Sequence, residues 1–257
     1  MCTLVLLYRP EHRWPILIAA NRDEMLDRAW DGPDAHWPDR PGVVAGRDRL
    51  AGGSWLGVNQ AGVAAAILNR TDSLGPAANK RSRGELVLDA LDHNEAADAV
   101  AALSALDPGA YRTFNLVIAD NSGAFWLRSR DGTSPVEAFP IDPGLSVITS
   151  TNINDTGNFR IATYLPRFRE AAAPDPDKAD WAAWQALLAS REAQPEAGPS
   201  GAMCIVTDYG YGTVSSSLIA LASAEVSIQD GVEDIWLFAS GRPDDAPYEP
   251  IRVARGD

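Results

Sequence analysis

The amino-acid sequence predicts an α+β sandwich, in which helices cover the outer faces of β-sheets. Three observations favour this class. Strand-like apolar runs open the chain, helical patterns occupy its middle, and strand-like runs return at its end. The 257 residues, of which 46% are apolar, can bury a substantial core without metals or disulfides. No repeat or low-complexity tract divides the sequence, so we expect a single domain over residues 1–257.

The chain opens with a predicted hairpin. Residues 3–8 and 14–20 are apolar runs typical of buried strands, and residues 10–13 form the turn between them. The second run ends in four polar residues, Asn21-Arg22-Asp23-Glu24. Because a hairpin folds back on itself, we expect these polar groups to lie close to residue 2, where the first strand begins.

The next segment is predicted to be a loop followed by a second hairpin. Residues 27–53 contain three prolines and several glycines, which are typical of loops. Residues 55–59 and 63–68 then predict two strands around a turn at residues 60–62.

Helices and strands alternate over the rest of the chain. Ser82-Arg83-Gly84-Glu85 has the spacing of a capping box and predicts the start of a long helix, while Pro166 must kink or interrupt a later one. Helices are expected at residues 82–106, 158–172 and 179–192. Strands are expected at residues 115–119, 124–129, 145–149, 203–207, 215–222 and 234–239.

The charge balance narrows the classes of partner. With 35 acidic and 22 basic residues the formal net charge is -13, so the surface repels phosphate backbones and nucleic acid is not an expected partner. No stretch approaches the roughly 20 apolar residues that cross a bilayer, and the N-terminus lacks the basic region of a signal peptide. We therefore expect a cytoplasmic protein with no integral membrane segment that acts on a small-molecule substrate or ligand.

Cys2 is the strongest candidate for chemistry. A free thiol has a pKa of about 8.5 and needs a nearby base or cation to react at neutral pH. If Met1 is removed, the α-amino group of Cys2, with a pKa of about 7.7–8.0, can take the thiol proton. Asp23 can then anchor the ammonium, and Arg22 can favour the thiolate by its charge. The alternative is a buried apolar Cys2 followed, after the second strand, by a solvated polar turn.

An acyl-transfer site also needs donors for the oxyanion. Asn69 and Asn152 follow apolar runs and can supply amide donors, although Asn154 and Asn158 are equally suitable on chemistry alone. Asparagine at a strand end more commonly forms a turn or a cap. The cysteines form no CxxC pair and the histidines show no ligand spacing, so no metal site is expected. The number of cysteines alone does not exclude a disulfide between Cys2 and Cys204.

Several different short motifs are spread along the chain: Met1-Cys2-Thr3, Asn21-Arg22-Asp23-Glu24, Gly52-Gly53-Ser54-Trp55-Leu56-Gly57-Val58-Asn59, Gly62 through Asn69-Arg70, Arg83-Gly84, Phe114-Asn115-Leu116, Ser150-Thr151-Asn152 and Tyr211-Gly212-Thr213. Together they resemble the NRDE family, also called the transport-and-Golgi-organisation protein 2 family. The resemblance covers essentially the whole chain. Tyr-Gly-Thr is usually followed by arginine in that family, whereas Val214 stands here, so an anion-binding role for that arginine is lost or moved.

More distantly, the Cys-Thr start, the 57–69 run and Thr151-Asn152 are similar to the choloylglycine hydrolase and penicillin V acylase group. These are Ntn (N-terminal nucleophile) hydrolases. The resemblance implies a four-layer αββα sandwich with two mainly antiparallel sheets. It also implies Cys2 as nucleophile, Asp23 near the α-amine, and Asn69 and Asn152 as oxyanion donors. Those hydrolases carry an arginine three positions before the aspartate, where this chain has Ala20, so Arg22 would have to substitute for it.

Three functional hypotheses follow. The first is an Ntn cysteine hydrolase that cleaves a linear amide or thioester through Cys2 after Met1 removal and needs no cofactor. The second, implied by the family resemblance, is a non-catalytic protein that binds and carries haem, acyl-CoA or a lipid in the same pocket. Cys2, His12, His36 or His93 would then be the candidate iron ligand. A purely structural protein is disfavoured, because clustered polar groups at the ends of buried strands are costly without a purpose.

Overall fold

The computed structural model describes residues 2–253, which form thirteen strands in two antiparallel sheets, five α-helices and three short 3-10 helices. The strands of the first sheet are β1 (Thr3–Tyr8), β2 (Ile16–Met25), β10 (Gly144–Ile148), β11 (Tyr211–Leu221), β12 (Ile235–Ala239) and β13 (Tyr248–Ile251). Those of the second are β3 (Trp30–Asp34), β4 (Val43–Asp48), β5 (Leu56–Asn59), β6 (Ala64–Asn69), β7 (Phe114–Ala119), β8 (Ala124–Ser129) and β9 (Glu137–Pro140). The α-helices are α1 (Glu85–Leu91), α2 (Ala96–Ser104), α3 (Phe159–Glu170), α4 (Ala182–Leu188) and α5 (Ala224–Asp230).

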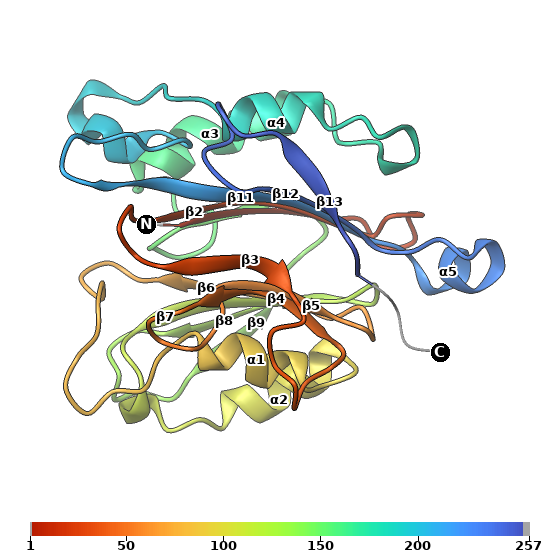
Figure 1. Ribbon diagram of the computed structural model, residues 1–257, viewed down its shortest axis with the longest axis horizontal. Helices are drawn as coiled ribbons and strands as arrows, with labels where there is room; N and C mark the ends of the chain where they lie inside the picture. The colour runs from red at the N-terminus through yellow and green to blue at the C-terminus, as the bar shows by residue number, and fades with distance from the viewer. Residues whose placement is uncertain (1, 254–257) are drawn as a thin grey trace.

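The two sheets stack face to face between two layers of helices (Figure 1). The strand order is β10-β1-β2-β11-β12-β13 in the first sheet and β3-β4-β5-β6-β7-β8-β9 in the second. Helices α3 and α4 cover the outer face of the first sheet, and α1 and α2 cover that of the second. The expected four-layer αββα sandwich is confirmed. Within residues 2–253, no helix is both long and apolar enough to cross a membrane.

Side chains along the first two strands alternate between two apolar layers, as the period of a strand requires. Leu4 of β1 and Ile18 of β2 point into the core between the sheets. Their neighbours Val5 and Ala19 pack instead under α3 and α4. β1 and β2 are therefore buried on both faces over most of their length, and successive residues pack into opposite layers.

The predicted first hairpin is confirmed, but its second strand is longer than expected. β1 and β2 pair antiparallel with Thr3 opposite Asn21. β2 continues through the Asn-Arg-Asp-Glu motif to Met25 because β11 pairs with it along this whole length. The four polar residues therefore alternate between the two faces of a strand and do not gather in a turn beyond it.

The prediction of a loop over residues 27–53 is wrong, because this segment contains β3 and β4. β3 lies at the edge of its sheet and its register with β4 is irregular, so Pro33 is tolerated there without a ladder donor. Asp31 joins the two strands by accepting hydrogen bonds from Arg47 and Arg49 at 2.8 and 2.7 Å. The second hairpin, β5 and β6, forms as predicted.

The single helix predicted over residues 82–106 is also wrong, because it is divided into α1 and α2. Side chains from the second sheet satisfy the backbone at the break. The Asn59 amide donates to the carbonyls of Leu91 and His93 at 2.8 and 2.7 Å. The Asp120 carboxylate accepts from the N–H of Ala96 at 2.7 Å. These distant partners terminate one helix and start the next.

The expected capping box does not form at the start of α1. Ser82 Oγ accepts from the N–H of Gly84 at 3.2 Å, and Gly84 is the N-cap residue without a side-chain cap. The Glu85 carboxylate instead accepts from Arg81 at 2.8 Å. The residues of a capping box are thus present at the right spacing, but they bond to other partners.

Residues 203–207 do not form the predicted strand, because in the described part of the chain they contribute only a single bridge, from Val206 to Gly212. The sequence did not predict β9, β13 or α5. β9 and β13 lie at the edges of their sheets and bury none of their residues, so they lack the apolar alternation that marks a strand.

Candidate active site

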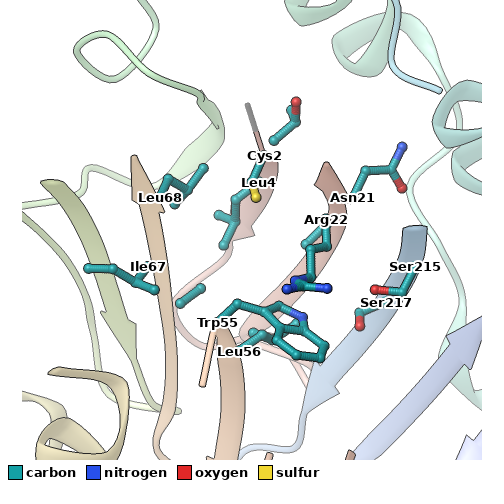
Figure 2. A pocket seen from close by; sticks show the side chains of 13 residues that line it. Cys2, Leu4, Asn21, Arg22, Trp55, Leu56, Ile67, Leu68, Ser215 and Ser217 are labelled. Carbon is teal, nitrogen blue, oxygen red and sulfur yellow. The ribbon is translucent and has the colours of Figure 1, made fainter. Parts of the chain in front are cut away.

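A cavity between the two sheets contains the Cys2 side chain. It has about 320 Å³ of empty space, including its opening to solvent. Cys2 is half-buried directly before β1 and packs against the core between the sheets. Figure 2 shows its sulfur on the same side of the sheet as the Arg22 guanidinium. Apolar walls come from Leu4, Trp55, Leu56, Ala66 and Leu68, and the cavity's hydroxyl groups include those of Ser215 and Ser217.

Arg22 is the buried cation of this cavity. Its side chain is only 5% exposed, and its guanidinium carbon lies 4.2 Å from the centre of the Trp55 ring and 5.9 Å from that of Trp30. Its Nη2 lies 4.0 Å from carboxylate oxygens of both Glu24 and Asp48. Within residues 2–253, its Nη1 is buried without a hydrogen-bond partner. The cavity therefore offers a desolvated N–H donor on a positive charge.

The Cys2 thiol is held in its protonated form by its surroundings. Burial raises the pKa of Cys2, and the negative charge of Asp23 adds to this effect, whereas the charge of Arg22 opposes it. The sulfur lies 3.8 Å from the main-chain carbonyl oxygen of Asp23, to which the thiol donates. A thiol in this state needs a base before it can attack a carbonyl.

The Asp23 carboxylate lies on the opposite face of β2 from Arg22. It accepts hydrogen bonds from Arg160 Nη1 at 3.0 Å and from Thr213 Oγ1 at 2.7 Å. The same Arg160 nitrogen donates to Thr3 Oγ1. These bonds fix the carboxylate on the face of β2 away from the cavity. Met1, whose removal the predicted mechanism requires, lies outside the described residues, so the contact of Asp23 with the α-amine stays a prediction.

A β-bulge at Val214 sets which side chains of β11 reach the cavity. Thr213 pairs with Asp23, but Ser215 pairs with Arg22, so the register shifts between them. On a regular strand, the side chains of two residues that are two positions apart, such as Thr213 and Ser215, would face the same side. The extra residue lets Thr213 bind Asp23 on one face and lets Ser215 line the cavity on the other. Val214 thus has a structural role at the place where the family usually has arginine.

Asn69 and Asn152 are not among the residues that line the cavity. Asn69 pairs with Phe114, whose ring packs under α1 and α2, and paired residues of antiparallel strands point to the same face. Asn152 is exposed, and its Oδ1 accepts from Arg70 Nη2 at 3.1 Å. The structure thus brings Cys2 and Arg22 together but neither asparagine, and their role as oxyanion donors stays a prediction.

The two alternative asparagines have structural partners. Asn154 Oδ1 accepts from the N–H of Val147 at 2.8 Å. The Asn158 side chain caps α3 by accepting from the N–H groups of Arg160 and Ile161. Both are the turn and cap uses that asparagine commonly has.

Three residues of this region were not predicted from the sequence: Arg160, Thr213 and Ser215. Arg160 and Thr213 are 137 and 190 positions away from Asp23 along the chain. The weak signal for Thr213 was its place in the Tyr-Gly-Thr motif. For Arg160, no local pattern distinguished it from the other charged residues of a surface helix.

The three histidines proposed as iron ligands lie outside the cavity lining. His12 Nδ1 bonds to the N–H of Trp14, and His36 Nε2 lies 2.7 Å from the Gly32 carbonyl oxygen. Among the described residues that line the cavity, Cys2 is the one side chain that commonly ligates iron. Across residues 2–253, no group of three His, Cys, Asp or Glu side chains is placed to hold a metal ion. Cys2 and Cys204 are both free thiols, which excludes the disulfide between them.

Two antiparallel sheets between helical layers, with a cysteine before the first central strand, define a protein of the Ntn-hydrolase fold. A solved structure supports this class: the N-acylethanolamine-hydrolyzing acid amidase ortholog of Caenorhabditis elegans superposes with a TM-score of 0.56 over 84% of this chain and 92% of that one. The two sequences are 15% identical, so the likeness concerns the fold.

The chain belongs to the family described as Transport and Golgi organisation 2, whose model matches residues 1–228. Among curated relatives, the Transport and Golgi organization protein 2 homolog of Bos taurus is 30% identical over 160 residues, and that of Homo sapiens is 29% identical over the same length. The matched region spans 57% of this chain and 56% of each relative.

Proposed function

We propose that this protein is an Ntn-type cysteine hydrolase that cleaves a linear amide or thioester through Cys2 once Met1 is removed. The observation that carries the proposal is the shared cavity of the Cys2 thiol and the Arg22 guanidinium, whose Nη1 is buried without a partner among the described residues. A nucleophile beside a desolvated cation is the arrangement that stabilises negative charge developing in acyl transfer.

In this mechanism the α-amine of Cys2 takes the thiol proton, and the thiolate attacks the substrate carbonyl carbon. The carbon–sulfur bond forms and the carbonyl oxygen becomes an oxyanion. Collapse of this intermediate breaks the bond to the amine or thiol leaving group, which receives the proton from the ammonium. Water then attacks the acyl-cysteine, releasing a carboxylic acid and restoring the thiol.

Arg22 would assist at two points. Its charge opposes the burial that raises the pKa of Cys2, and its Nη1 can donate to the oxyanion. Asn69 and Asn152 are the further donors proposed from the family resemblance. They lie outside the cavity lining, so their participation requires movement of the segments that carry them or a substrate that extends beyond the cavity.

The test uses the full chain and a series of acyl thioesters and linear amides as probes. Intact-mass spectrometry of protein purified from cells should show Met1 absent and, during turnover, an acyl adduct on Cys2. Cys2→Ala should abolish the adduct and turnover. Cys204→Ala is the matched control, because it removes the other thiol and should retain both. Retained Met1, or turnover by Cys2→Ala, would exclude this mechanism.

A second candidate is binding of an acyl ligand without turnover. The apolar walls formed by Leu4, Leu56, Ala66 and Leu68 favour it, because they suit a hydrocarbon chain. An acyl-CoA that binds equally to wild type and Cys2→Ala, remains intact and leaves no adduct would support this function over hydrolysis.

A further inference from the structure

Seven large apolar side chains are exposed at one end of the molecule, where β1 begins and the Cys2 cavity lies. They are seven of the nine such exposed residues found in residues 2–253. The exposed fraction reaches 60% for Leu26, 77% for Leu50 and 66% for Tyr209. We call this set the apolar rim; its members are Met25, Leu26, Leu50, Leu74, Phe159, Val206 and Tyr209.

Hydrogen bonds hold several of these residues side by side although they come from different loops. The N–H of Leu26 donates to the carbonyl of Gly210 at 2.8 Å, which joins the end of β2 to the loop that carries Tyr209. Arg28 donates to Asp48 at 2.8 Å, which joins the segment after β2 to the loop of Leu50. The β2 end and the two loops therefore form one face.

The segment that follows β6 completes this face and is fixed in place. Arg83 donates to the carbonyl of Ser73 at 2.7 Å, and Arg112 donates to that of Asp72 at 2.7 Å. These bonds hold the backbone on both sides of residue 73 while the next side chain, Leu74, is 51% exposed. Phe159, the first residue of α3, stands beside Arg160, which reaches Asp23. The rim thus surrounds the end of β2 from both sheets.

The same segment carries a local excess of positive charge. Residues 70–83 contain four basic residues and one acidic residue, in a chain that has 35 acidic and 22 basic residues in total. Lys80 and Arg81 are both exposed, and Arg81 pairs with Glu85 at 2.6 Å. Asp27 and Asp208 are also exposed at this end, so the positive charge is concentrated on the 70–83 side of the rim.

We propose that this end of the molecule docks on the surface of a bilayer that contains anionic lipid. Exposed aliphatic and aromatic side chains next to basic residues are the composition that inserts shallowly among lipid headgroups. A second copy of the chain is a poorer occupant, since a symmetric contact would bring the basic 70–83 segments together. Docking would turn the Cys2 end toward the membrane, whether or not the cavity catalyses turnover.

The experiment measures co-flotation of the full chain with two kinds of vesicle, pure phosphatidylcholine and phosphatidylcholine with 30 mol% phosphatidylserine (about a third anionic lipid). We expect binding to the anionic vesicles, weakened by salt. The triple variant Leu26→Ser/Leu74→Ser/Tyr209→Ser should lose it at least tenfold. Ile228→Ser is the matched control, because Ile228 is 82% exposed on α5 at the opposite end (Figure 1) and should bind like wild type.

A second variant tests the charge separately. Lys80→Gln/Arg81→Gln should weaken binding to anionic vesicles by about fivefold for each charge removed, and melting temperatures should show that every variant folds. Cys2→Ala should bind like wild type, so a failure of hydrolysis leaves this result unaffected. Absence of binding by wild type, equal binding to both vesicles, an equal loss in Ile228→Ser, or rim-dependent dimers without vesicle binding would overturn the proposal.

Discussion

Arg22 opposes the burial of the Cys2 thiol, and removing its charge should therefore change the reactivity of that thiol. Because burial raises the pKa of Cys2 and Arg22 lowers it, Arg22→Gln should raise this pKa further. The thiolate fraction at a given pH then falls. In a Cys204→Ala background we expect alkylation by iodoacetamide at pH 7.5 to slow about three- to tenfold (roughly half to one pKa unit), with the pH–rate curve displaced to higher pH.

Arg47→Gln is the control for that experiment, because Arg47 is 40% exposed and pairs with Asp31. An unchanged pH–rate curve in Arg22→Gln would show that Arg22 does not act on the thiol. In the wild type, Cys204 should compete poorly with Cys2 for iodoacetamide, because burial and the charge of Asp244 raise the pKa of Cys204 to about 12.

At the same scale, the sequence predicted only the contacts that a hairpin brings together. Cys2 and Arg22 come from adjacent strands with a short turn, so their proximity followed from the folding back of the chain. The partners of Asp23 come from α3 and β11, more than a hundred positions away. Such pairings depend on how the layers stack, which no local pattern in a single sequence reveals.

The break between α1 and α2 depends on one side chain of the neighbouring sheet. Asn59 is buried and uses both ends of its amide: it donates to Leu91 and His93 and accepts from the N–H groups of Ala61 and Val63. Asn59→Ala should lower the free energy of unfolding by about 2–3 kcal/mol, since buried backbone groups lose their partners. Urea denaturation measures this loss.

Asn94→Ala is the matched control for Asn59→Ala. Asn94 lies exposed in the same break, so its removal should change the unfolding free energy by no more than about 0.5 kcal/mol. Equal losses in the two variants would mean that the break does not depend on the Asn59 amide.

This element shows why the helical pattern was misleading. Apolar residues continue at helical spacing through residues 82–106, and that periodicity is real in both α1 and α2. The interruption comes from hydrogen-bond partners supplied by β5 and by the turn after β7. For the edge strands, the sequence pattern missed an element that is present. β3 contains a proline and β9 buries none of its residues, so their sequences resemble loops although a neighbouring strand pairs with each of them.

Across the whole molecule, the buried pair of Arg160 and Asp23 ties the helical layer to the first sheet. Arg160→Met would remove a charged hydrogen-bond partner from the buried Asp23 carboxylate, and we expect the unfolding free energy to fall by about 3–5 kcal/mol. The double variant Asp23→Asn/Arg160→Met should recover part of the loss, because it removes both charges. A double variant as unstable as the sum of its two single variants would show that the pair is not coupled.

The layered architecture followed from the order of strand and helix patterns, and the family resemblance extended it to four layers. The site was predicted less completely, because the cavity between the two sheets is lined by strands that are far apart in the sequence. Ser215 shows this limit. Its place in the cavity depends on the bulge at Val214 and on the pairing of β11 with β2, and neither is visible in the sequence around it.

The side chains of β2 alternate between the cavity on one face of the sheet and the helical layer on the other. Ala20 and Arg22 belong to the cavity side, whereas Asn21 and Asp23 bind the groups that hold the α3 and α4 layer in place. A mutational scan along this strand should therefore show two interleaved phenotypes. Substitutions of Ala20 and Arg22 should alter ligand chemistry in a protein that still folds, and those of Asn21 and Asp23 should lower its yield. The four contiguous residues Asn21-Arg22-Asp23-Glu24 would then combine two independent roles at alternating positions of one strand.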